Sequence, residues 1–286
     1  MKIREQSLPR GWYPGNADAI ISFLNNYSGG NGKQNSIAAI APHAGWYFSG
    51  VTAAISFSAL DKNADTIAVI GGHLPSGYPV LYGEEEGFKT PLGIIESDME
   101  LLDKISEKLT MASDRFKDNR VDNTVEVLLP MAKYFFPKAK LLWFRFPADI
   151  ASFHSGKIIA ECAKGLGRRI VVVGSTDLTH YGANYGFSPE GSGQKALNWV
   201  KEINDARFIK AVLDDDPAAV LDRADKEMSS CSAGAVLGAM GFASSSAPPA
   251  KPELLDYRTS ADARDACQQN AEGIPDSFVG YASIVF

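Results

Sequence analysis

Short apolar runs that end in glycine, serine, histidine or aspartate recur along the chain and constrain its fold more than any other feature. The clearest run, Ile-Val-Val-Val at residues 170–173, is typical of a strand buried on both faces of a parallel sheet. Similar runs occupy residues 36–41, 66–70 and 140–146. Because segments with helical spacing of apolar residues separate these runs, the pattern predicts an α/β fold.

The helical spacing of apolar residues is found in six segments, at residues 50–60, 96–109, 125–136, 151–166, 196–213 and 233–240. Residues 253–259 and 278–286 resemble strands, and we expect them to complete the same sheet. No long polar tract divides the 286 residues, so we expect one domain over residues 1–286. In that domain helices flank a central, mostly parallel sheet and form a sandwich with it.

The charge balance and the apolar content narrow the classes of partner. The chain has 28 basic and 34 acidic residues and a net charge of −6, which argues against binding to nucleic acid. No stretch approaches the ~20 apolar residues that span a bilayer. Residues 1–6 lack the apolar segment of a signal peptide. We therefore expect a cytoplasmic protein whose partners are neither nucleic acids nor membranes. The sequence contains no glycine-rich nucleotide-binding motif, so nothing in it indicates a nucleotide cofactor.

Three of the four histidines follow a predicted buried strand by a few residues, namely His43, His73 and His180. Ligands bind at the carboxyl edge of an open α/β sheet, so these side chains are candidates for one functional site. For each histidine taken alone, the alternative is a hydrogen-bonded loop residue. His154 lies inside a helical segment and is predicted to be structural or on the surface.

Two further features adjoin these histidines. Asp177 precedes His180 by three residues. Both side chains can therefore project into one cavity, with Asp177 orienting an imidazole and His180 carrying a proton. The alternative is that Asp177 caps a helix start. Trp46 and Phe48 follow His43 and either form a pocket wall or belong to the core.

The three cysteines show no Cys-x-x-Cys spacing, which excludes a disulfide framework or a zinc knuckle readable from sequence. Cys231 lies among serines at the predicted start of a helix. A helix N-terminus favours the thiolate, which suits a metal ligand or a nucleophile. A buried inert cysteine is the alternative, and it is our expectation for Cys162 and Cys267.

A set of short motifs, in order and over nearly the whole chain, resembles the Memo family, the protein labelled B in the Ammecr–Memo–radical-SAM grouping. The motifs are Arg-Gly-Trp-Tyr-Pro at 10–14, Ala-Pro-His-Ala-Gly at 41–45, Gly-Gly-His at 71–73, Lys-Thr-Pro-Leu-Gly at 89–93, Val-Glu-Val-Leu-Leu-Pro at 125–130, Ser-Thr-Asp-Leu-Thr-His-Tyr-Gly at 175–182, Cys231 and Tyr-Ala-Ser at 281–283.

The Memo family in turn resembles the class III extradiol ring-cleaving dioxygenases, whose non-haem iron is held by two histidines and one glutamate. The resemblance implies that His43 and His73 match the two histidine ligands and that Cys231 takes the place of the carboxylate. It also implies that His180 matches the catalytic acid/base histidine and that the fold is class III extradiol dioxygenase-like. The grouping of Cys231 with the histidines comes from the family alone.

The implied activity is that of a metal-dependent enzyme acting on a small oxygenated or aromatic substrate. The implied metal is iron, with copper or zinc as alternatives because a thiolate is a soft ligand. The implied partners are Ammecr-type and radical-SAM proteins. Where the family usually has Glu-His-Ser, this chain has Asp122, Asn123 and Thr124. Asn123 thus replaces a pocket histidine; an amide donates hydrogen bonds but cannot exchange protons.

Two other functions stay open at this point. One is a binding module for a phosphorylated peptide or another anion, for which Lys89 and Arg145 are the candidate cations. The other is a metal carrier, or a site that only stabilises the fold. A structural zinc site normally has four protein ligands, and only three are evident here.

Overall fold

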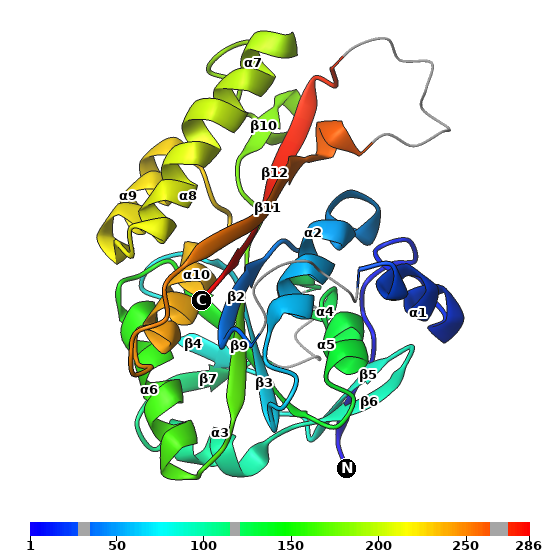
Figure 1. Ribbon diagram of the computed structural model, residues 1–286, viewed down its shortest axis with the longest axis vertical. Helices are drawn as coiled ribbons and strands as arrows, with labels where there is room; N and C mark the ends of the chain where they lie inside the picture. The colour runs from blue at the N-terminus through cyan, green and yellow to red at the C-terminus, as the bar shows by residue number, and fades with distance from the viewer. Residues whose placement is uncertain (28–34, 115–120, 264–273) are drawn as a thin grey trace.

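The computed structural model describes residues 1–27, 35–114, 121–263 and 274–286, and a twisted sheet runs through its centre (Figure 1). The strand order is β10-β12-β2-β9-β3-β8-β4-β7, and β11 pairs with β12. The four central strands are mutually parallel, namely β2 (Ala38–Ala41), β9 (Ile170–Ser175), β3 (Thr66–Leu74) and β8 (Lys140–Pro147). This arrangement confirms the predicted α/β fold with helices flanking a central sheet.

On one side of this centre, β12 (Ser277–Val285) pairs antiparallel with β2, and both β10 (His180–Gly182) and β11 (Glu253–Thr259) pair antiparallel with β12. On the other side, β4 (Val80–Tyr82) pairs antiparallel with β8, and β7 (Met111–Ser113) pairs parallel with β4. A second sheet, which the sequence pattern did not predict, consists of β1 (Ile3–Arg4), β5 (Gly87–Thr90) and β6 (Gly93–Glu96).

Helices cover both faces of the central sheet (Figure 1). On one face lie α3 (Met99–Ser106), α6 (Ala151–Gly165), α8 (Asp205–Leu213), α9 (Pro217–Glu227) and α10 (Ala233–Ala243). On the other face lie α1 (Ala17–Asn25), α2 (Trp46–Ala59), α4 (Asn123–Glu126) and α5 (Leu129–Phe135). Helix α7 (Gly193–Trp199) lies beyond the end of the sheet that carries β10.

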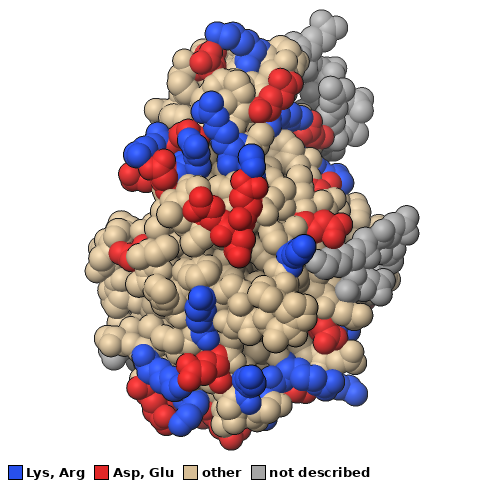
Figure 2. Space-filling view, turned by 60° about the vertical axis from the view of Figure 1, so that its left-hand side comes forward, with Lys and Arg blue, Asp and Glu red and all other residues tan. Residues whose placement is uncertain are grey.

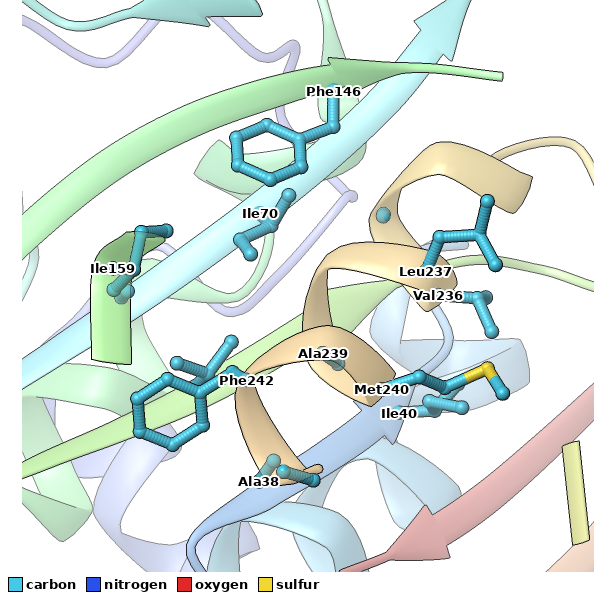
Figure 3. Close-up of a cluster of buried hydrophobic side chains, with 14 of the residues drawn as sticks. Ala38, Ile40, Ile70, Phe146, Ile159, Val236, Leu237, Ala239, Met240 and Phe242 are labelled. Atoms are coloured by element: carbon cyan, nitrogen blue, oxygen red, sulfur yellow. The ribbon is translucent and has the colours of Figure 1, made fainter. Parts of the chain in front are cut away.

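Successive residues of each central strand enter the two opposite cores, which explains the unbroken apolar runs. Ile70 and Val172 belong to the core under α10, whereas their neighbours Val69 and Val173 belong to the core under α2. Figure 3 shows the first core, where Ile70 and Phe146 face the apolar helix α10. Every residue of α10 is buried, so the helix is apolar all round.

Three predicted helices differ from the observed ones for local reasons. The helix predicted at residues 96–109 begins only at Met99, because Asp98 caps it by accepting a hydrogen bond from the Leu101 amide. The helix predicted at residues 125–136 is two helices, and Pro130 lies in the first turn of the second.

The third is the helix predicted at residues 196–213. In the structure this segment is α7, a π-helical turn at Val200–Asn204, and α8.

None of the helices that the structure describes combines the length and the apolar character needed to cross a membrane. On the face shown in Figure 2, basic and acidic side chains are interspersed.

Candidate metal centre

The predicted histidines converge at the carboxyl edge of the parallel strands. His43 follows β2 by two residues, His73 is the next-to-last residue of β3, and His180 begins β10. The rings of His43 and His73 are perpendicular, with centroids 5.0 Å apart. The parallel order of β2, β9 and β3 produces this meeting, since all three strands end at the same edge.

Cys231 lies against both of these rings. Its Sγ is 3.2 Å from Nε2 of His43, and the backbone N–H of Cys231 donates a hydrogen bond to the carbonyl of Asp177. Each of His43, His73 and Cys231 offers one ligand atom, and these three atoms all lie within 4.8 Å of one another. An ion bound at ~2.0–2.3 Å from each ligand bridges separations of this order.

Neighbouring polar groups hold both imidazoles by Nδ1. The Ser175 hydroxyl lies 2.8 Å from Nδ1 of His43, and Oδ2 of Asp122 lies 3.2 Å from Nδ1 of His73. This leaves Nε2 of each ring for another partner, which is the usual state of a metal-binding histidine. The donor set therefore fits a metal ion.

The charges in the cluster shift the pKa values of the two imidazoles and of the thiol in opposite directions. Burial by itself lowers the pKa of His43, but the charges of Cys231 and Asp177 outweigh it and raise that pKa above its ordinary value. Burial also opposes protonation of His73, whereas hydrogen bonds with Asp122 and Cys231 raise its pKa to about 10.

The sulfur shifts the other way. Burial raises the pKa of the Cys231 thiol, but the two imidazoles outweigh it and hold that pKa well below its ordinary value. These shifts favour a thiolate beside protonated rings. A cation can replace the ring protons in such an arrangement.

Two glycines at the end of β3 permit this packing. A Cβ atom on Gly71 would lie 2.1 Å from Oγ1 of Thr124, and one on Gly72 would lie 2.4 Å from Cβ of Ser232. His73 itself has a positive φ of 56°, which is uncommon for a residue with a side chain. The Gly-Gly-His motif thus brings β3 close to α4 and to the residue next to Cys231.

A cavity of about 750 Å³ opens beside the cluster. Its lining comprises Arg10, Gly11, Trp12, His43, Ala44, Gly45, Phe48, His73, Asn123, Asp177, His180, Asn184, Tyr185, Ser260, Ser277, Val279 and Tyr281. The volume lies within the range of small-molecule sites, ~300–1,000 Å³.

The structure brings the predicted acid/base pair to this cavity, but not with the predicted contact. Nδ1 of His180 lies 3.1 Å from the Leu178 carbonyl, and its ring packs against Tyr185. Asp177 starts no helix in the described chain; its Oδ1 accepts hydrogen bonds from the backbone N–H groups of His43 and Ala44. Asp177 thus holds the loop that carries His43 rather than the imidazole of His180.

Two of the three predicted pocket residues line the cavity, and the third does not. Asn123 lines the cavity and donates a hydrogen bond of 2.9 Å from its side chain to the carbonyl of His43. Phe48 also lines the cavity and is 46% exposed. Trp46 belongs to the core instead, because it lies on the inner side of α2 and its Nε1 donates to the Val127 carbonyl. The pocket-wall interpretation is therefore corrected for Trp46.

Neither of the predicted anion-binding cations lines the cavity. Lys89 pairs with Glu5 at the surface, and Arg145 is buried among Asp114, Asp122 and the carbonyl of Gly72.

The remaining predicted residues lie in helix α6 or outside the described chain. His154 and Cys162 both belong to α6, and Cys267 lies outside the described residues. Sequence reasoning missed Asp122 as the partner of His73, because the two residues are 49 positions apart and no local pattern links them. It also missed Arg10 on the cavity wall.

Comparison with known proteins places this chain beside one family. Residues 4–285 match the family model described as Memo-like protein. A MEMO1 family protein of Pyrococcus abyssi is 30% identical over 298 residues, covering 99% of each chain. One of Thermococcus onnurineus is 31% identical over 299 residues, again with 99% coverage of each. Among solved structures, an uncharacterized protein of Escherichia coli K12 aligns with a TM-score of 0.48 and 11% identity, over 86% of this chain and 98% of that chain.

Proposed function

The chain belongs to the Memo-like family, and from that premise we propose that it is a metal-dependent enzyme acting on a small oxygenated or aromatic molecule. The observation that carries the proposal is the meeting of His43, His73 and Cys231 beside a cavity of about 750 Å³. In sequence these three residues are far apart, and their convergence with one ligand atom each is what a shared metal ion requires.

The donor set supports a transition metal. Two imidazole nitrogens and one thiolate suit iron, copper(I) or zinc better than magnesium, and we propose iron first. Three protein ligands leave an open position, which is typical of catalytic sites rather than structural ones. A bound metal would supply Lewis-acid or redox chemistry to a substrate oxygen at that position.

The other residues of the cavity then have separate roles. His180 is the candidate proton donor and acceptor, because it lines the cavity without being one of the three clustered ligands. Asp177 and Asn123 position His43 through its backbone N–H and its carbonyl. The aromatic rings of Phe48 and Tyr185 line the cavity and offer apolar surface to the substrate.

A cytoplasmic location and a partnership with Ammecr-type and radical-SAM proteins are further parts of this proposal. Both rest on the family resemblance. Co-purification of the tagged protein from its own cells, followed by identification of the bound proteins, tests the partnership.

Metal analysis of protein purified under reducing conditions tests the metal site. Wild type should carry close to one equivalent of metal, and the double variant His43→Ala, His73→Ala should carry almost none. His154→Ala, which removes the histidine in α6, is the matched control and should retain the wild-type content. Equal metal content in wild type and the double variant would refute the proposal.

A further inference from the structure

Arg10 differs from the other described arginines in its partners. Seven of the eight arginines in the described chain pair with a carboxylate, and Arg10 has no such partner there. Arg10 also lines the cavity beside the metal cluster. A guanidinium stays charged at all relevant pH values, so an unpaired one on a cavity wall is suited to an anionic ligand.

The segment that carries Arg10 is anchored on both sides. Before it, the buried carboxylate of Glu126 accepts hydrogen bonds from the backbone N–H groups of Ser7 and Leu8. After it, the Trp12 carbonyl accepts a hydrogen bond of 2.8 Å from the N–H of Trp46. These contacts fix the backbone on both sides of Arg10 beside the cavity, and the exposed Arg10 side chain is part of the cavity lining.

The remaining lining defines what kind of anion fits. Trp12, Phe48, Tyr185 and Tyr281 provide flat apolar surface. The one acidic side chain among the lining residues is Asp177, and backbone N–H groups of His43 and Ala44 already engage it. The cavity therefore offers a cation and aromatic surface to a molecule with an anionic end and an apolar body.

The number of cations favours a carboxylate over a phosphate. A guanidinium binds a carboxylate through two parallel hydrogen bonds. Arg10 is the single lysine or arginine among the lining residues, so outside the cluster, whose rings hold the metal in this proposal, one side-chain cation balances one negative charge. A phosphate monoester carries a charge near −2 at neutral pH and is usually held by several cations.

We propose that the cavity binds a small aromatic carboxylate whose carboxylate group pairs with Arg10. The inference deepens the proposed function, because it names the substrate class of the same site. It assigns specificity to Arg10, while the cluster of His43, His73 and Cys231 beside the cavity is left for chemistry.

Calorimetric titration with four probes tests this assignment, using the full chain both after chelator treatment and after loading with Zn²⁺. The probes are benzoate, 4-hydroxybenzoate, the neutral benzamide and phenyl phosphate. The variants are Arg10→Gln, which removes the charge, and Arg10→Lys, which keeps it without the planar fork. Arg169→Gln is the matched control, because Arg169 is exposed, pairs with Asp65 and precedes β9 at the opposite edge of the sheet.

We expect the two carboxylates to bind wild type, and Arg10→Gln to weaken that binding by about tenfold or more. Arg10→Lys should retain part of the affinity, and Arg169→Gln should retain all of it. Benzamide should bind at least about tenfold more weakly than benzoate.

Several results would overturn the proposal. These are no binding of either carboxylate, equal binding of benzamide, an affinity indifferent to Arg10→Gln, or tighter binding of phenyl phosphate, which would point to a phosphorylated ligand. A failure of the proposed function has a different signature: the wild-type protein holds no metal, while benzoate still binds the chelator-treated protein through Arg10.

Discussion

Asp122 and His73 are 49 positions apart in the chain, yet Oδ2 of the aspartate lies 3.2 Å from Nδ1 of the imidazole. The same carboxylate oxygen lies 3.2 Å from a terminal nitrogen of the buried Arg145. Hydrogen bonds with His73 and the charge of Arg145 outweigh burial and lower the pKa of Asp122 to about 2. An ionised Asp122 therefore fixes the ring of His73 with Nε2 available for a metal.

The first prediction concerns this contact. Asp122→Asn should weaken metal binding by ~10–100-fold, because the amide orients the His73 ring less firmly and no longer raises its basicity. Competition with a chromophoric chelator measures the affinity. Asp65→Asn, which alters an exposed ion pair with Arg169, is the control. An unchanged affinity in Asp122→Asn would mean that this carboxylate does not orient the ligand.

The second prediction concerns protons released when a metal binds. The pKa of His73 is raised to about 10 and that of His43 is also raised, while that of Cys231 is lowered. At pH 7 the metal should therefore displace protons from the rings rather than from the thiol, whereas ordinary pKa values would give about one proton from the thiol and about half a proton from the two rings together. Calorimetry of Zn²⁺ binding in buffers of different ionisation enthalpy counts these protons. Proton release and the rise of affinity with pH should accordingly continue to about pH 10, where His73 titrates. A release that ends near pH 8.5, the ordinary value of a thiol, contradicts the shifts.

The third prediction concerns Asp205, the first residue of α8. This fully buried carboxylate accepts hydrogen bonds from the N–H and hydroxyl of Thr179 and from the Tyr257 hydroxyl. Burial raises its pKa from 3.8 to about 6. Because the folded protein holds this proton more tightly than the unfolded chain, stability from this group is present below about pH 4 and is lost as pH rises through 6.

Relative to wild type, the free energy of unfolding of Asp205→Asn should therefore shift in favour of the variant by about 2 kcal/mol between pH 4 and pH 7. Urea denaturation across this range measures the shift. Asp18→Asn, in the exposed first turn of α1, serves as the control. A pH-independent difference for Asp205→Asn would show that its carboxyl titrates normally.

The fourth prediction concerns the close contact between α6 and α10. A Cβ atom on Gly156 would lie 2.0 Å from the carbonyl oxygen of Gly238, so Gly156→Ala should force the helices apart and destabilise the fold by ~1–3 kcal/mol or more. Gly165→Ala, at the end of the same helix, meets no atom within 4 Å and should be neutral or stabilising by up to ~1 kcal/mol. Thermal unfolding of both variants compares them. Equal melting temperatures would contradict the tight packing.

The centre of the sheet was predictable because its strands are buried on both faces. Such a strand must be apolar at every position, and the run at residues 170–173 meets that condition within β9. The strands β1, β4 and β7 have only two or three residues each. They exist through hydrogen bonds to distant partners, and a local pattern therefore gave no signal for them.

The site was partly predictable for a similar reason. Placing His43 and His73 near strand ends needs only local information, and the parallel sheet then brings these ends together. The grouping with Cys231 came from the family resemblance. The role of Asp122 was not predictable, because its partner His73 lies far away in the chain. Nor was that of Arg10, because its place in the cavity lining and its lack of a carboxylate partner among the described residues depend on distant segments.

By itself, the sequence determined which strand ends carry imidazoles and which helix begins near a cysteine, since both follow from the local order of apolar and polar residues. Only the tertiary structure decided that Sγ of Cys231 lies 3.2 Å from a ring 188 positions away. That distance depends on how α10 packs on the sheet, through glycines whose missing side chains let two backbones approach. Contacts between remote segments arise from the packing of the whole core, and no local pattern encodes them.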